Sequence, residues 1–116
     1  MSIKDLILIL PEEYIDKVAE RNPSIVDFKE ILKNKELSEK FVYKYRDYVD
    51  WSFISRSWKL SEDFIEKYKD YVDWRAISAN QKLSESFIER HKDRIDWDMI
   101  FKYQELSDKF IKYKVN

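Results

Sequence analysis

Paired aspartates recur in the sequence at a spacing that could do chemistry. Asp47 and Asp50 are three residues apart, and the pair returns at positions 70/73 and 93/96. Two carboxylates can share acid–base catalysis or bind a metal ion. Each second aspartate, however, directly precedes a tryptophan at the start of a predicted helix, where it can cap the first turn. Three copies also exceed what one active site needs. We therefore predict no catalytic and no metal-binding residue.

The first aspartate of each pair needs a partner. Asp47, Asp70 and Asp93 fall near the C-terminal ends of predicted helices, where the helix dipole disfavours a negative charge. We expect a neighbouring group to compensate for that charge, although the sequence does not name it.

Other reactive side chains are scarce. The 116 residues include no Cys, no Gly and one His, which is His91. A chain without Cys has no thiol nucleophile, thiolate zinc site or disulfide, and one without Gly has no glycine-rich phosphate loop. His91 takes the place of Tyr45 and Tyr68 in the repeat described next, which indicates a packing role. The sequence thus predicts a non-enzymatic protein without a cofactor.

The elements that hold these side chains form a repeat of 23 residues. Leu37, Leu60, Leu83 and Leu106 each open the pattern Leu-Ser-acid-x-Phe-(Ile/Val), and a Val/Ile-Asp-Trp triplet follows in three of the four copies. The serine predicts the N-cap of one short helix and the aspartate that of a second. Helices of two or three turns are marginal alone, so they must stack. We predict an all-α fold, a small α-solenoid of helix-turn-helix repeats with period 23.

The repeat also predicts the organisation of the chain. We interpret residues 1–116 as a single helical-repeat domain. Its parts are a divergent first unit at 10–36 with four extra residues near 21–24, full repeats at 37–59, 60–82 and 83–105, and a C-terminal half-repeat at 106–116. Phe110, Ile111 and Val115 of the half-repeat could expose a stacking face, so self-association through it is open.

The segment before the first unit bears on location. The apolar run Leu6–Leu10 is too short to span a bilayer and lacks the features of a cleaved leader. We expect no membrane partner. The absence of Cys is compatible with the reducing cytoplasm.

The repeat carries a resemblance to known sequences. Leu60-Ser61-Glu62-Asp63-Phe64-Ile65, followed by Asp73-Trp74-Arg75-Ala76-Ile77-Ser78, resembles the short helical repeats of uncharacterised bacteriophage and large DNA virus proteins. The resemblance covers residues 10–116 and departs at Pro11, Phe28 and Phe101, which replace the cap serine, the tryptophan and a serine. It implies a phage or viral accessory protein in the host cytoplasm, for instance one that binds and inhibits a host defence protein, and it implies no catalytic residue.

Residues that break the repeat are candidates for partner binding, because repeat arrays keep a scaffold and vary a contact surface. Tyr43 aligns with Glu66 and Glu89, and Tyr103 with Ser57 and Asn80. Trp58 aligns with glutamines and lies on the same predicted helical face as Trp51 and Ile54. Its side chain could therefore be either buried or exposed. Aromatic and Arg side chains often anchor interfaces, although scattered surface aromatics are also common. The predicted partner-binding residues are Tyr43, Arg56, Trp58, Arg75, Lys102 and Tyr103.

A nucleic-acid partner is the alternative. Basic residues gather toward the ends of the first helices and could follow a phosphate backbone, but they would equally complement helix dipoles, and the net charge is only −1. Trp51, Trp74 and Trp97 could stack on bases, yet each shares a face with an isoleucine and is predicted to pack in the core. The basic stripe consists of Lys44, Arg46, Lys67, Lys69, Arg90, Lys92 and Arg94.

Overall fold

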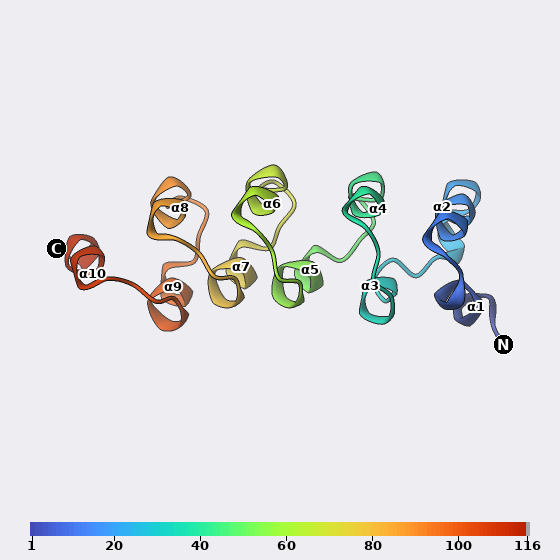
Figure 1. Cartoon of the computed structure of the whole chain (residues 1–116), viewed down its shortest axis with the longest axis horizontal. Coiled ribbons are helices and arrows are strands. Elements are labelled where there is room, and N and C mark those ends of the chain that lie inside the picture. Colours follow the sequence, from blue (N-terminus) through green and yellow to red (C-terminus); the bar gives the residue numbers. More distant parts are fainter. Residues whose placement is uncertain (116) are drawn as a thin grey trace. The chain divides into compact units, whose positions relative to one another are not determined.

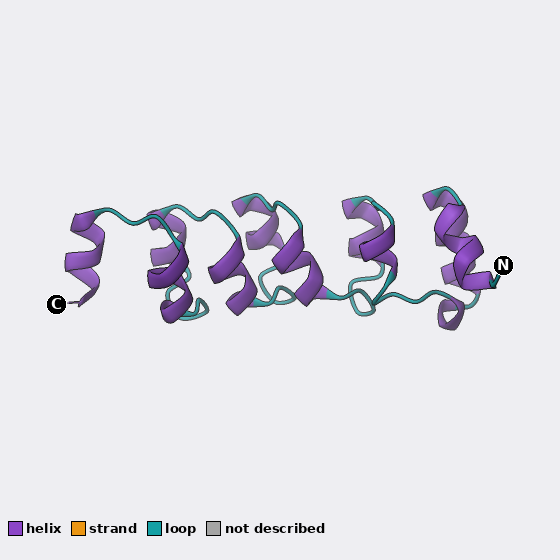
Figure 2. Ribbon diagram, turned by 90° about the horizontal axis from the view of Figure 1, so that it is seen from below, coloured by secondary structure: helices purple, strands orange, loops and turns teal. Residues whose placement is uncertain are grey.

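The computed structural model describes residues 1–115. These residues form helices joined by short loops and contain no strand, which confirms the predicted all-α class (Figure 2). The helices are α1 (Ile3–Ile9), α2 (Glu12–Arg21), the short 3-10 helix η1 (Pro23–Ile25), α3 (Ile31–Asn34), α4 (Glu39–Lys44), α5 (Trp51–Ser57), α6 (Glu62–Lys67), α7 (Trp74–Asn80), α8 (Glu85–Arg90), α9 (Trp97–Tyr103) and α10 (Asp108–Val115). Asn116, the last residue of the predicted half-repeat, lies outside the described residues.

The contacts of the chain fall into two compact units, residues 1–50 and residues 51–116. The first unit contains α1 to α4 and the second α5 to α10 (Figure 1). Each unit has buried side chains of its own. Ile15, Ile31 and Val42 are buried in the first, and Ile65, Ile77 and Ile88 in the second. The interpretation of the whole chain as a single domain stays a prediction.

The second unit alternates two kinds of short helix. α6 and α8 lie on one side, whereas α5, α7 and α9 pack side by side on the other (Figure 1). Corresponding helices begin 23 residues apart, at Trp51, Trp74 and Trp97 for the second kind. A helical repeat of the expected kind is therefore present.

The caps that the sequence predicts define where these helices begin. The hydroxyls of Ser61 and Ser84 accept hydrogen bonds from backbone N–H groups three residues later, at 3.0 and 3.2 Å. The carboxylates of Asp73 and Asp96 do the same, both at 3.2 Å. No residue in 1–115 has a positive φ angle, so these corners require no glycine.

The tryptophans pack between successive repeats. Trp51 is half-buried, with its ring centre 5.3 Å from that of Tyr68 and 5.6 Å from that of Tyr71. Trp74 lies 5.1 Å from His91 in the same way. Aromatic packing at these distances stabilises beyond burial alone. The tryptophans thus belong to the packing of the unit, as the sequence pattern indicates.

Two glutamines tie successive repeats together. The Gln81 amide nitrogen donates to the carbonyls of Ser55 (2.8 Å) and Trp58 (2.6 Å), and its oxygen accepts from the N–H of Leu60 (2.9 Å). Gln104 makes the corresponding three bonds one repeat later. Each glutamine therefore satisfies backbone groups that the helix ends leave without partners.

The cap serines form a second tie. The N–H and hydroxyl of Ser84 donate to the two carboxylate oxygens of Glu62, at 2.6 and 3.0 Å, while the same hydroxyl caps its own helix. Ser107 binds Glu85 in this way, and in the first unit Ser38 binds Glu12. One side chain thus joins a helix start to the preceding repeat.

The first unit departs from the regular pattern. α1, which the sequence analysis did not predict, begins with a capping box between Ser2 and Asp5. α2 has ten residues where α4 has six, and η1 follows it. The position of the four extra residues near 21–24 stays a prediction. Phe28 stands in the place of the tryptophan and packs 5.3 Å from Tyr45. None of the helices within residues 1–115 has the length and apolar character needed to cross a membrane.

Candidate functional site

The structure places the six predicted partner-binding residues in different units. Tyr43 lies on α4 of the first unit with 51% of its surface exposed, and the Arg46 guanidinium stacks 4.5 Å from its ring centre. The second unit contains the other five, which are Arg56, Trp58, Arg75, Lys102 and Tyr103.

Four of those five lie on exposed positions of the neighbouring helices α5, α7 and α9. We call Arg56, Arg75, Lys102 and Tyr103 the second-helix surface. Arg75 lies 3.8 Å from the Asp96 carboxylate, and Arg56 donates to the Ser52 hydroxyl at 3.3 Å. Such exposed contacts contribute little free energy, so a partner's groups can replace them. Trp58 is half-buried, and its carbonyl accepts the bond from Gln81.

The basic stripe contains ion pairs between repeats. Arg94 donates to the Asp70 carboxylate at 3.0 Å, which identifies the partner that the position of this aspartate requires. Arg90 lies 3.1 Å from Glu66, and in the first unit Lys44 lies 2.8 Å from Asp16. These cations hold carboxylates of the preceding repeat.

Two carboxylates of this kind have lowered pKa values. Burial on its own would raise the pKa of Asp16, but hydrogen bonds from Lys44 and Tyr45 outweigh that effect and hold the pKa below its ordinary value. At Glu66, burial would likewise raise the pKa. The charges of His91, Arg90 and Lys69 outweigh that effect, so the pKa of Glu66 is also lowered. Burial and the bond to Asp16 raise the pKa of Tyr45 to about 12.

We expect these two pairs to make stability depend on pH. A carboxylate whose folded-state pKa is lowered stabilises the fold above its unfolded pKa of roughly 4, and this stabilisation is lost as the pH falls through the folded value. The free energy of unfolding, measured by urea titration, should therefore decrease as the pH falls below about 5. Glu66→Gln should flatten this decrease. The matched variant Glu105→Gln, at an exposed glutamate, should leave the slope unchanged, and an equal effect of both would contradict the assignment.

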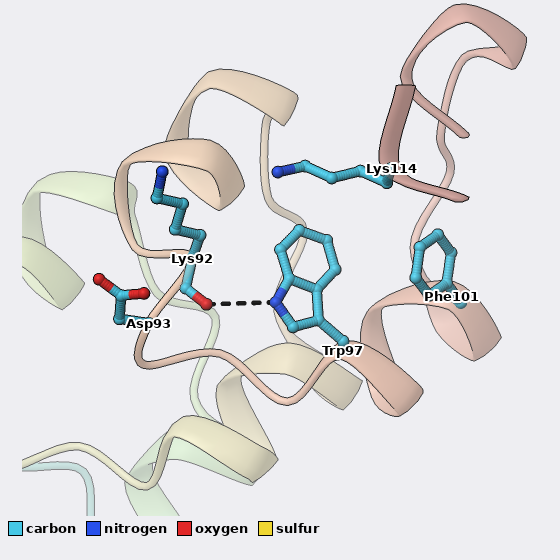
Figure 3. A pocket seen from close by; sticks show the side chains of 5 residues that line it. All are labelled: Lys92, Asp93, Trp97, Phe101 and Lys114. Carbon is cyan, nitrogen blue, oxygen red and sulfur yellow. Dashed lines mark hydrogen bonds between the residues drawn. The ribbon is translucent and has the colours of Figure 1, made fainter. Parts of the chain in front are cut away.

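A pocket beside Trp97 lies in the second unit. Lys92, Asp93, Trp97, Phe101 and Lys114 line a volume of about 360 Å³, which falls in the range of small-ligand sites, roughly 300–1,000 Å³. In Figure 3, Lys92 and Asp93 lie on one side of the indole and Phe101 on the other. We call these five residues the Trp97 pocket.

Hydrogen bonds and charges fix the walls of the Trp97 pocket. The Trp97 indole N–H donates to the Lys92 carbonyl at 3.2 Å (Figure 3). The Lys114 ammonium lies 4.8 Å from the Trp97 ring centre and 2.5 Å from the Glu89 carboxylate, an ion pair without hydrogen-bond geometry. Phe101 is 43% exposed and its ring centre lies 5.7 Å from that of Trp97. The pocket thus combines an aromatic floor with polar groups at its edge.

This pocket was not predicted from the sequence. Phe101 was visible as a departure from the repeat serine, and Lys114 stands where Tyr45, Tyr68 and His91 stand in earlier repeats. Both residues are visible in the sequence as departures from the repeat. That they lie together at Trp97 is evident only from the structure.

The half-repeat that carries Lys114 is partly covered. Phe110 is half-buried and stacks 6.5 Å from Trp97, whereas Ile111 and Val115 are exposed. Self-association through these residues stays a prediction.

Within residues 1–115, no three His or carboxylate side chains gather as they would around a metal ion. Compared with protein-family models, curated proteins and solved structures, the chain matches none of them.

Proposed function

We propose that this chain is a non-enzymatic protein-binding module that contacts its partner through the second-helix surface. The supporting observation is a difference between two sets of positions in the second unit. Ser84 and Ser107, which join their helices to the preceding repeat, are the same residue and make the same bonds to Glu62 and Glu85. Outward positions vary instead, since Ser57 and Asn80 align with Tyr103. A scaffold that is kept while its surface changes is typical of repeat proteins that bind partners.

The chemistry of the surface favours an acidic partner. Arg56, Arg75 and Lys102 are exposed cations on neighbouring helices, and Tyr103 is 55% exposed with the Lys102 ammonium 5.3 Å from its ring centre. Arginine and tyrosine are frequent interface anchors, and complementary charge speeds and orients association. The partner should therefore present carboxylates around an apolar contact for Tyr103.

The biological setting we propose rests on the sequence resemblance alone. A phage or viral accessory protein of this kind would act in the host cytoplasm by covering a surface of a host defence protein. Nucleic-acid binding through the basic stripe has weaker support, because Lys44, Arg90 and Arg94 already hold carboxylates.

Charge reversal tests the second-helix surface. The variant Arg56→Glu, Arg75→Glu, Lys102→Glu should weaken partner binding roughly 10- to 100-fold, because exposed pairs contribute about 0.2–1 kcal/mol each and reversal adds repulsion of similar size. A photo-reactive residue in place of Tyr103 should first identify the partner by crosslinking in host lysate. Affinity is then measured with the purified partner.

The matched control reverses three other exposed lysines of the same unit, Lys59, Lys82 and Lys109, and should bind normally. Equal weakening by both variants would mean that only net charge matters. Crosslinked material that a nuclease removes would instead favour the nucleic-acid alternative.

A further inference from the structure

A small cleft opens between α1 and α3 in the first unit. These two helices lie on one side of that unit, and α2 and α4 lie on the other (Figure 1). The cleft has a volume of about 90 Å³, and its lining residues come from α1, α3, η1 and the turn between η1 and α3. Sites for drug-sized molecules measure roughly 300–1,000 Å³. The cleft therefore suits a single side chain.

A difference between the two units accounts for the cleft. In the second unit the corresponding helices α5 and α7 pack directly against each other, and the Ser55 hydroxyl accepts the Asp73 N–H at the start of α7, at 3.0 Å. Asp5 stands at the position of Ser55, five residues before the leucine that opens the next repeat. Its carboxylate accepts instead from the Ser2 N–H of its own helix start, at 3.4 Å. Asp5 thus does not tie α1 to the start of α3 as Ser55 ties α5 to α7.

The floor of the cleft is aliphatic. Ile7 and Ile31 are buried, with 4% and 2% of their surface exposed, and the half-buried side chains of Leu8 and Ile25 line the cleft with them. Water bound on such a floor finds few hydrogen-bond partners, so an aliphatic group can replace it favourably. The floor therefore favours a branched aliphatic side chain such as that of leucine.

The rim of the cleft carries mostly negative charge. Its charged residues are three carboxylates and one ammonium, which belong to Asp5, Asp27, Glu30 and Lys4. The Asp27 carboxylate accepts the Glu30 N–H at 3.2 Å, and its other oxygen lies 4.0 Å from the Lys4 ammonium. Lys4 is exposed, and a pair of this kind contributes little free energy, so a second cation can approach Asp27. Lys33 pairs with Glu30 at 3.1 Å from outside the cleft. The rim favours a cation over an anion.

We propose that the cleft between α1 and α3 binds a segment of a partner protein in which a leucine-type side chain stands next to a lysine or an arginine. The aliphatic side chain lies on Ile7 and Ile31, and the neighbouring cation faces Asp27 and Glu30. This inference goes beyond the proposed function and is independent of it. It concerns the first unit, and it requires a cationic segment where the second-helix surface favours an acidic partner.

A series of short peptides tests the two parts of the proposal on the unaltered chain. Acetyl-Lys-Leu-Lys-amide carries both the aliphatic side chain and the cations, acetyl-Lys-Ala-Lys-amide lacks the first, and acetyl-Gln-Leu-Gln-amide lacks the second. The isoleucine δ-methyl NMR signals report binding, with that of Ile25 assigned by Ile25→Val. We expect a saturable shift with the first peptide and about tenfold weaker binding of the alanine peptide. The glutamine peptide should bind roughly two- to fivefold more weakly, as exposed charge pairs allow.

Asp27→Asn tests the charge of the rim. Asparagine keeps an oxygen that can accept the Glu30 N–H, so the fold should persist. Binding of the Lys-Leu-Lys peptide should weaken roughly two- to fivefold, whereas binding of the Gln-Leu-Gln peptide should not change. The matched control Asp47→Asn, at an exposed aspartate of the same unit outside the cleft, should bind both peptides like the original chain.

A second variant tests the aliphatic lining without changing a charge. Ile25→Ala should weaken binding of both leucine peptides several-fold, whereas Val18→Ala, at a half-buried position of α2 outside the cleft, should not. Equal binding of the leucine and alanine peptides, or no effect of Asp27→Asn, would overturn the proposal. So would tighter binding of acetyl-Glu-Leu-Glu-amide than of the lysine peptide. Signals that shift with protein concentration in the absence of peptide would assign the cleft to a second copy of the chain and overturn it as well.

Discussion

Gln81→Ala is expected to lower the free energy of unfolding of the second unit by about 2–4 kcal/mol. The substitution leaves the carbonyls of Ser55 and Trp58 and the N–H of Leu60 without their partner. Each buried group left without a hydrogen bond costs roughly 1–3 kcal/mol, reduced where water can enter. Urea unfolding followed by tryptophan fluorescence measures this unit specifically, because all four tryptophans lie between residues 51 and 97.

Asn80 provides the matched control for Gln81. Its exposed side chain amide donates to the Ala76 carbonyl within its own helix, at 3.0 Å. Asn80→Ala removes an amide at the adjacent position without breaking a tie between repeats, so we expect a change below about 0.5 kcal/mol. If the two variants lost equal stability, the ties between repeats would not carry the effect that we assign to them.

Ile77→Ala is expected to have the other large effect, a loss of about 2–5 kcal/mol in the same unfolding experiment. Ile77 is completely buried on α7, the helix that packs against both α5 and α9. Truncation removes apolar contacts and leaves a cavity that these neighbours can only partly fill. The loss should also appear as faster hydrogen exchange of the amides in α7.

Ile111→Ala is the comparison of the same residue type on the surface. Ile111 stands at the repeat position of Ile65 and Ile88, both fully buried, yet it is 37% exposed on α10. Its truncation should cost at most about 1 kcal/mol. A cost equal to that of Ile77→Ala would show that Ile111 is covered in solution, as self-association through the half-repeat predicts.

The helix starts could be predicted because capping is local. Ser61 and Ser84 accept bonds from groups three residues away, and a cap residue signals its helix wherever the rest of the chain lies. The 23-residue spacing then indicates that the units must stack. α1 carries a local signal of the same kind, the capping box of Ser2 and Asp5, but it stands outside the repeat and the helix was not predicted from it.

The ties and the pocket could not be predicted in this way. Gln81 binds groups 21 to 26 residues away, and its role depends on how one repeat lies against the next. The partner of Asp70 was expected but became identifiable as Arg94 only in three dimensions. The Trp97 pocket depends on how Trp97, Phe101 and Lys114 meet in three dimensions, which a search for recurring residues does not show.

The ties also bear on how such a chain changes its length during evolution. Residues 60–82 contain groups for the ties to both neighbouring repeats. Glu62 and Ser78 bind the following repeat. Gln81 binds the preceding one, and Ser61 holds the position at which Ser84 does so. A duplicated copy of this segment would meet matching partners at both of its ends. The array can therefore gain or lose whole units by duplication or deletion of coding sequence, without a compensating substitution at either junction.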